Sequence, residues 1–144
     1  MLGTFGHGYT YSAHPLGAAV AIEAIRIYRE TDIAARVRRL APQLQGGLRA
    51  LAASPIVGEV RGVGLIAAVE LVKDKATKAQ FPAAAAVGAH FAERAHGHGL
   101  VVRPLGDSVA LCPPLIIEPG EIDEMLARFT KALHDTESYA ATLQ

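Results

Sequence analysis

The chain has 144 residues, of which 51% are hydrophobic and 19% are charged. This length and composition predict one globular domain and exclude a disordered tail or a membrane bundle. Lys and Arg total 14 against 14 Asp and Glu, so the net charge is zero, and we expect neither a nucleic-acid nor a membrane partner. The single cysteine, Cys112, cannot form an internal disulfide, which favours a reducing, cytoplasmic location.

The first third of the chain predicts a loop followed by two helices. Residues 1–14 lack the basic start of a signal peptide and are too rich in Gly and His for a membrane span, so we expect an ordered loop. Pro15 and the alanine-rich run after it begin a helix that should end near Thr31. Apolar residues then recur every three or four positions over 33–51, which predicts a second helix that Pro42 should kink or divide.

The rest of the chain alternates strands and helices. The expected elements are strands at 57–61 and 65–71, a loop at 73–80, a helix after Pro82 with Ala84, Val87, Phe91 and Ala95 on one face, two or three short strands within 100–117, and a last helix with Ile122, Met125, Phe129 and Leu133 on its apolar face. This order predicts an α+β domain with about four helices packed on a small, mostly antiparallel sheet.

Two patterns suggest a ligand site but are better explained by a turn and by helix capping or solvent exposure. GVGLIA at 62–67 fits the loose dinucleotide fingerprint, but a second strand follows it where a helix is required, so we expect a structural turn. His90, His96 and His98 form the nearest histidine cluster, but no cysteine or suitably spaced carboxylate completes a metal site. We therefore expect these histidines to cap a helix or lie in solvent, and we assign no metal.

The segment FGHGYTYSAHP, residues 5–15, places glycines and hydroxyls directly before a helix. Glycines beside hydroxyl and backbone donors are what a phosphate site uses, and Thr10 could donate from both its hydroxyl and its amide. The alternative is an irregular lead-in whose hydroxyls only cap the helix that starts at Pro15. The residues alone leave both interpretations open.

Arg103 interrupts an apolar strand just before the turn at Gly106. Its guanidinium either pairs locally with Asp107 or stands free to bind a carboxylate through two parallel hydrogen bonds. Arg61, which precedes Gly62, has the same two possibilities with weaker support.

Three segments together resemble a known family. FGHGYTYSAHP, then VGEVRGVGLIAAVEL, then GLVVRPLGDSVALCPPLII with EIDEM, resemble the C-terminal small-domain portion of class III pyridoxal-phosphate aminotransferases of the omega-amino-acid:pyruvate type. The resemblance runs from about Thr4 to Thr136. It implies that residues 1–14 are a phosphate-contacting loop and lead-in, and that residues 15–144 are the small domain.

The resemblance also implies roles for individual residues. Tyr9 and Thr10 match the positions that reach the phosphate of pyridoxal phosphate across a dimer interface, with Thr10 the stronger candidate. Arg103 matches the arginine that binds the substrate carboxylate and swings aside for an amine. His14 stands in the family's motif without an assigned chemistry. A homodimer or higher oligomer is implied, acting on an amine or amino acid and a keto acid such as pyruvate.

No catalytic residue is assigned, because the family's cofactor-binding lysine lies upstream of the first of these segments. None of the lysines of this chain stands at the position of that cofactor-binding lysine; they are Lys73, Lys75, Lys78 and Lys131. We therefore expect the isolated chain to be inactive and not to hold the cofactor covalently. The alternative is a non-catalytic dimerising or partner-binding module derived from this domain.

Overall fold

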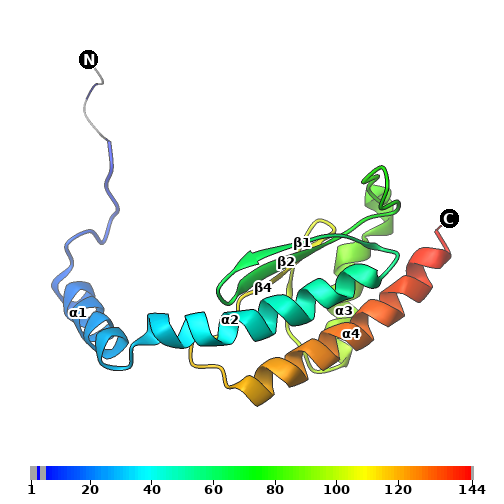
Figure 1. Ribbon diagram of the computed structural model, residues 1–144. Helices are drawn as coiled ribbons and strands as arrows, with labels where there is room; N and C mark the ends of the chain where they lie inside the picture. Colours follow the sequence, from blue (N-terminus) through cyan, green and yellow to red (C-terminus); the bar gives the residue numbers. More distant parts are fainter. Residues whose placement is uncertain (1–2, 4–5, 144) are drawn as a thin grey trace. The chain divides into compact units, whose positions relative to one another are not determined.

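The computed structural model describes residue 3 and residues 6–143. The chain divides into two compact units, residues 1–34 and 35–144, and each is described by itself. Figure 1 shows the ribbon and labels all of the helices and strands described below except β3 and the two 3₁₀ turns.

The first unit consists of the N-terminal segment and helix α1, Pro15–Glu30. Pro15 occupies the first turn, where its missing N–H costs nothing, and Thr31 ends the helix by donating from its amide and its hydroxyl to the Ile27 carbonyl. On the polar face, Arg26 binds both Glu23 and Glu30. The predicted helix is confirmed, and no residue of α1 is buried.

Helix α2, Ile33–Ala50, continues without a break through Pro42. Proline removes the hydrogen bond to the carbonyl four residues earlier, which belongs to Arg38. Both residues are exposed, so water can satisfy that carbonyl. The expectation that Pro42 divides the helix is therefore wrong. A 3₁₀ turn, Leu51–Ala53, follows α2.

The second unit is built on one antiparallel sheet. Its strands are β1 Val57–Val63, β2 Ile66–Leu71, β3 Arg103–Leu105 and β4 Ser108–Leu111, in the order β1-β2-β4-β3. Two short strands, β3 and β4, form within 100–117, where two or three were expected. Gly64 provides the positive φ of +58° at the β1–β2 turn, and the Gln45 amide donates to the Gly64 carbonyl at 3.0 Å.

Two more helices complete this unit: α3, Val87–Gly97, and α4, Pro119–Ala141. A 3₁₀ turn, Ala83–Ala85, precedes α3; Ala84 lies in it, exposed, rather than on the helix's apolar face. Glu118 and Glu121 form a capping box at the start of α4. The α+β class is confirmed: the described residues form four α-helices and one antiparallel sheet, and α2, α3 and α4 pack on that sheet.

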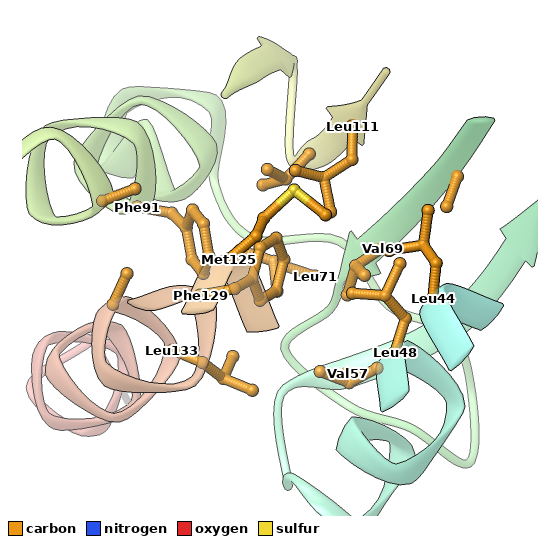
Figure 2. Packing of buried hydrophobic residues seen from close by; sticks show 14 of the residues in the cluster. Leu44, Leu48, Val57, Val69, Leu71, Phe91, Leu111, Met125, Phe129 and Leu133 are labelled. Atoms are coloured by element: carbon orange, nitrogen blue, oxygen red, sulfur yellow. The ribbon is translucent and has the colours of Figure 1, made fainter. Parts of the chain in front are cut away.

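The core lies on one face of the sheet. Figure 2 shows side chains of α2, α3 and α4 packed against side chains of the strands. Alternate residues of β2 and β4 point into this core and are buried, among them Val69, Leu71, Val109 and Leu111. The residues between them are half-exposed or exposed. No helix in the described part of the chain is long and apolar enough to cross a membrane.

The sheet therefore has an open face on its other side. Directly paired residues of an antiparallel sheet point to the same face. The register pairs Arg61 with Ala68, Ala68 with Ala110, and Ala110 with Arg103. One row across the open face thus carries an arginine at each end and two alanines between them.

Candidate functional site

The N-terminal segment contains a turn closed by hydrogen bonds between Tyr9 and Ser12. The Tyr9 amide donates to the Ser12 hydroxyl at 3.0 Å, and the Ser12 amide donates to the Tyr9 carbonyl at 2.9 Å. Tyr9 is 72% exposed, and its ring meets the His7 ring edge-on with 5.0 Å between the ring centroids. Since its amide is already occupied, Tyr9 can offer a ligand only its side chain.

Thr10, at the centre of this turn, keeps both of its donors free. Within the described part of the chain, nothing accepts a hydrogen bond from its hydroxyl or its amide. The alternative interpretation, in which hydroxyls of this segment cap α1, is not what the structure shows: the N-cap residue is His14, and it makes no side-chain capping bond. Two free donors on one exposed residue fit an anion such as a phosphate.

Arg103 lies in β3, one of the two edge strands of the sheet, where all three residues are exposed. Its guanidinium makes no hydrogen bond or ion pair with any residue that the structure describes. The expected local partner, Asp107, is used elsewhere, because its Oδ1 accepts a hydrogen bond from the Gly88 amide at 3.0 Å. The local Arg103–Asp107 pair is therefore wrong, and Arg103 is free to bind an external anion.

Arg61, at the other end of the same row, is neutralised. Its Nη1 lies 3.1 Å from Glu70 Oε2 and 3.7 Å from Glu59 Oε2. For this arginine the local pairing interpretation is correct. Of the two arginines in the strands, Arg103 alone keeps an unpaired charge.

The surroundings of Arg103 are open. Its neighbours along the row, Ala110 and Ala68, carry only methyl groups, so neither reaches above the sheet to cover the guanidinium. An exposed, unpaired guanidinium beside short side chains can present its planar fork of N–H donors to a carboxylate.

The histidines make contacts between helices that the sequence did not indicate. His98 Nε2 lies 2.7 Å from Asp135 Oδ2 of α4, and the His90 ring stacks on the Tyr139 ring at 4.1 Å. His96 is exposed on the last turn of α3. The described residues contain no group of three or more His, Cys, Asp or Glu that could hold a metal ion. GVGLIA forms the β1–β2 hairpin, so the structural-turn interpretation of this motif is confirmed.

The fold, a helix-covered antiparallel sheet with a free arginine on its open face, is compatible with a domain of an enzyme that binds small carboxylates. A family model, aminotransferase class III, matches residues 1–133. The chain belongs to the class III aminotransferase family, and these enzymes use pyridoxal phosphate.

Curated relatives agree with this assignment. Gamma aminobutyrate transaminase 1, mitochondrial, from Solanum lycopersicum is 44% identical over 143 residues, which cover 99% of this chain and 28% of the relative. Gamma-aminobutyrate transaminase 1, mitochondrial, from Oryza sativa subsp. indica is 46% identical over the same length, with the same coverage. The chain therefore spans less than a third of these relatives.

Solved structures show the same fold. The omega transaminase from Pseudomonas jessenii in complex with PMP superposes with a TM-score of 0.87 and 43% identity, over 94% of this chain and 30% of that one. The PMP-bound aminotransferase from Vibrio fluvialis gives a TM-score of 0.86 and 42% identity, with the same coverage.

Proposed function

We propose that this chain supplies substrate and cofactor contacts to a transaminase that moves an amino group between an amine or amino acid and a keto acid such as pyruvate. The observation that carries this proposal is the unpaired guanidinium of Arg103 on the open face of the sheet. The relatives named as gamma-aminobutyrate transaminases support a donor substrate that carries a carboxylate as well as an amine.

Arg103 binds the substrate carboxylate in this proposal. A bidentate guanidinium–carboxylate pair fixes the orientation of the substrate as well as its affinity, and the amino group is thereby placed relative to the cofactor. Because no described residue binds the Arg103 guanidinium, the long side chain can rotate away when the substrate is an amine without a carboxylate.

Thr10 and Tyr9 contact the phosphate of pyridoxal phosphate in this proposal. When bound, this cofactor supplies an electron sink and carries the amino group between the two halves of the reaction. Thr10 donates from its free hydroxyl and amide, and Tyr9 contributes its exposed side chain. Residues 1–14 are then the phosphate-contacting loop, residues 15–144 form the small domain, and the phosphate belongs to the cofactor of the other subunit in a homodimer.

The 144 residues by themselves are expected to be inactive. Lys75 donates to the carbonyls of Ala52 and Ser54 at 2.6 and 2.9 Å, and Lys78 donates to the Gly58 carbonyl at 2.7 Å. Lys73, on a loop, and Lys131, on the surface of α4, are both exposed. Borohydride treatment of the chain with pyridoxal phosphate should leave no stoichiometric label on any single lysine; such a label would contradict this expectation.

We also propose a cytoplasmic location. The support is Cys112, the single cysteine, which is exposed and free and so suits a reducing compartment. Relatives carry the names mitochondrial and chloroplastic, so recovery of the protein in an organelle fraction is the contradicting outcome.

The carboxylate role of Arg103 is tested by steady-state kinetics of a full-length enzyme that contains this segment. Arg103→Ala should raise KM for pyruvate or an amino acid, with a loss in kcat/KM of about 1.5 to 3 kcal/mol, or roughly tenfold to over a hundredfold. A simple amine should lose much less. Arg103→Lys should recover only part of the loss, because an ammonium keeps the charge but not the planar fork.

Arg61→Ala is the matched control. It removes the other arginine of the same row, whose charge is already neutralised by Glu70 and Glu59. Arg61→Ala should therefore not change kcat/KM for carboxylate substrates more than for amines. Equal losses on both substrate classes in Arg103→Ala would overturn the carboxylate role, remove Arg103 from the substrate site and leave Thr10 as the remaining functional residue.

A further inference from the structure

Asp107 joins three parts of the second unit. Its side chain accepts a hydrogen bond from the Gly88 amide of α3 at 3.0 Å, and its backbone carbonyl accepts one from the Leu71 amide at the end of β2 at 2.9 Å. Asp107 itself belongs to the two-residue turn between β3 and β4, which the pair Leu105–Ser108 closes. One residue thus connects the β3–β4 hairpin to a strand and to a helix.

Helix α3 needs this carboxylate because its own N-cap residue cannot cap it. That residue is Ala86, in the left-handed conformation with φ +46° and no side-chain capping bond. The first amides of a helix have no partner within the helix, and an acidic group there also interacts favourably with the helix dipole. Asp107 therefore caps α3 from a distant point in the sequence.

The same contact brings two backbones very close together. A Cβ added to Gly88 would lie 2.0 Å from the Gly106 carbonyl oxygen and 3.0 Å from the Asp107 Cα. Gly106 has φ +60°, a value that suits the first central residue of a tight hairpin turn. Glycine at both positions lets the turn rest directly on the start of α3.

Arg103 depends on this hairpin for its position. β3 has three residues and a single neighbouring strand, β4, and its middle residue, Pro104, has no N–H to donate. A three-residue strand at a sheet edge has few backbone hydrogen bonds to keep it in place. The far end of the hairpin, at Asp107, is the part that is fixed to α3 and β2.

We propose that Asp107 is a positioning residue for Arg103. By capping α3, its carboxylate holds the β3–β4 hairpin in place, and because this contact directs the carboxylate to the Gly88 amide, it makes no ion pair with the guanidinium four residues away. This inference rests on the proposed carboxylate role of Arg103 and deepens it. Asp107 does not touch the substrate; it determines where Arg103 stands and keeps its charge available.

Two variants separate this role from a general effect on folding. Asp107→Ala removes the acceptor, whereas Asp107→Asn keeps an oxygen that can accept from Gly88 and removes only the charge. In the full chain, hydrogen exchange should become faster at the Gly88 amide in Asp107→Ala and stay near the wild-type rate in Asp107→Asn. In the full-length enzyme, Asp107→Ala should raise KM for pyruvate about tenfold, with a simple amine little affected, and Asp107→Asn should restore most of the loss.

Asp74→Ala is the matched control. The Asp74 carboxylate also accepts a backbone N–H, from Thr77 at 2.7 Å, but in the 73–80 loop, so its loss should leave pyruvate and amine KM unchanged. If Asp107→Ala leaves Gly88 exchange unchanged, or speeds it while pyruvate KM stays at the wild-type value, the positioning role is wrong and the role of Arg103 still stands. If Arg103→Ala itself shows no preference for carboxylate substrates, both proposals fail.

Discussion

The rings of Phe91 and Phe129 lie 4.6 Å apart, at a tilt of 49°, and join α3 to α4 in the core (Figure 2). Both side chains are fully buried. The apolar faces of α3 and α4, predicted from hydrophobic residues at spacings of three and four, therefore meet at this aromatic pair. A substitution in the pair tests the core directly.

Phe129→Ala should lower the free energy of unfolding by about 3 to 5 kcal/mol, since it removes a buried ring and leaves a cavity that the backbone cannot close. Chemical denaturation of the chain measures this directly. Val63, 78% exposed in β1, provides the control, because Val63→Ala should change the stability by no more than about 0.5 kcal/mol. Similar losses in the two variants would contradict the assignment of the core.

Gly88→Ala tests the contact between α3 and the β3–β4 turn. Alanine favours a helix by about 1 kcal/mol over glycine, but here its Cβ would stand 2.0 Å from a backbone oxygen. Backbone displacement outweighs the helix preference, and we expect a net loss of about 1 to 3 kcal/mol in unfolding free energy. Gly97→Ala, in the same helix with nothing within 4 Å of the added Cβ, should be neutral or stabilising, and a stabilised Gly88→Ala would show that the two backbones are not in contact.

Thr10→Ala tests the phosphate contact. The variant removes the hydroxyl donor and leaves the amide, so the full-length enzyme should lose one hydrogen bond to a charged group, about 1.5 to 3 kcal/mol. The dissociation constant of pyridoxal phosphate, measured by titrating the apoenzyme, should rise roughly tenfold to a hundredfold. Thr10→Ser should restore it, and unchanged affinity in Thr10→Ala would remove Thr10 from the cofactor site.

Acid should loosen the 73–80 loop through Asp74. Hydrogen bonds from the Thr77 amide and hydroxyl hold the pKa of the Asp74 carboxyl below its ordinary value of 3.8. A carboxyl with a lowered pKa contributes stability above its ordinary pKa and loses it as the pH falls through the lowered value. An NMR titration should therefore give Asp74 a midpoint below 3.8, and Thr77→Val, which lacks the hydroxyl, should move this midpoint upward.

Most helices and strands could be predicted from the sequence, because each has a clear period and a clear start or stop. Pro15 marks a helix start, and the four apolar residues expected on one face of the last helix are buried as expected: Ile122, Met125, Phe129 and Leu133. Pro42 misled the prediction because the cost of an internal proline depends on whether the freed carbonyl reaches water. Exposure of that kind is set by tertiary structure and cannot be read from the local sequence.

The candidate site was only partly predictable. The residue types and their order singled out Thr10 and Arg103, but the partner of Arg103 could not be settled, because Asp107 stands only four positions away and favours a local pair on sequence grounds. Asp107 instead accepts a hydrogen bond from the backbone amide of Gly88. Since nearly every residue has a backbone amide, the sequence does not single out this partner. The glycine and the left-handed Ala86 that make this contact possible become significant only in three dimensions.

The most direct test of the account is a structure of the full-length enzyme with a carboxylate substrate analogue bound. We expect the Arg103 guanidinium to lie against the carboxylate through two N–H···O contacts of about 2.7 to 2.9 Å, while Asp107 keeps its hydrogen bond to the Gly88 amide. A carboxylate bound by other residues, with Arg103 paired to Asp107 or pointing away into solvent, would contradict the central claim.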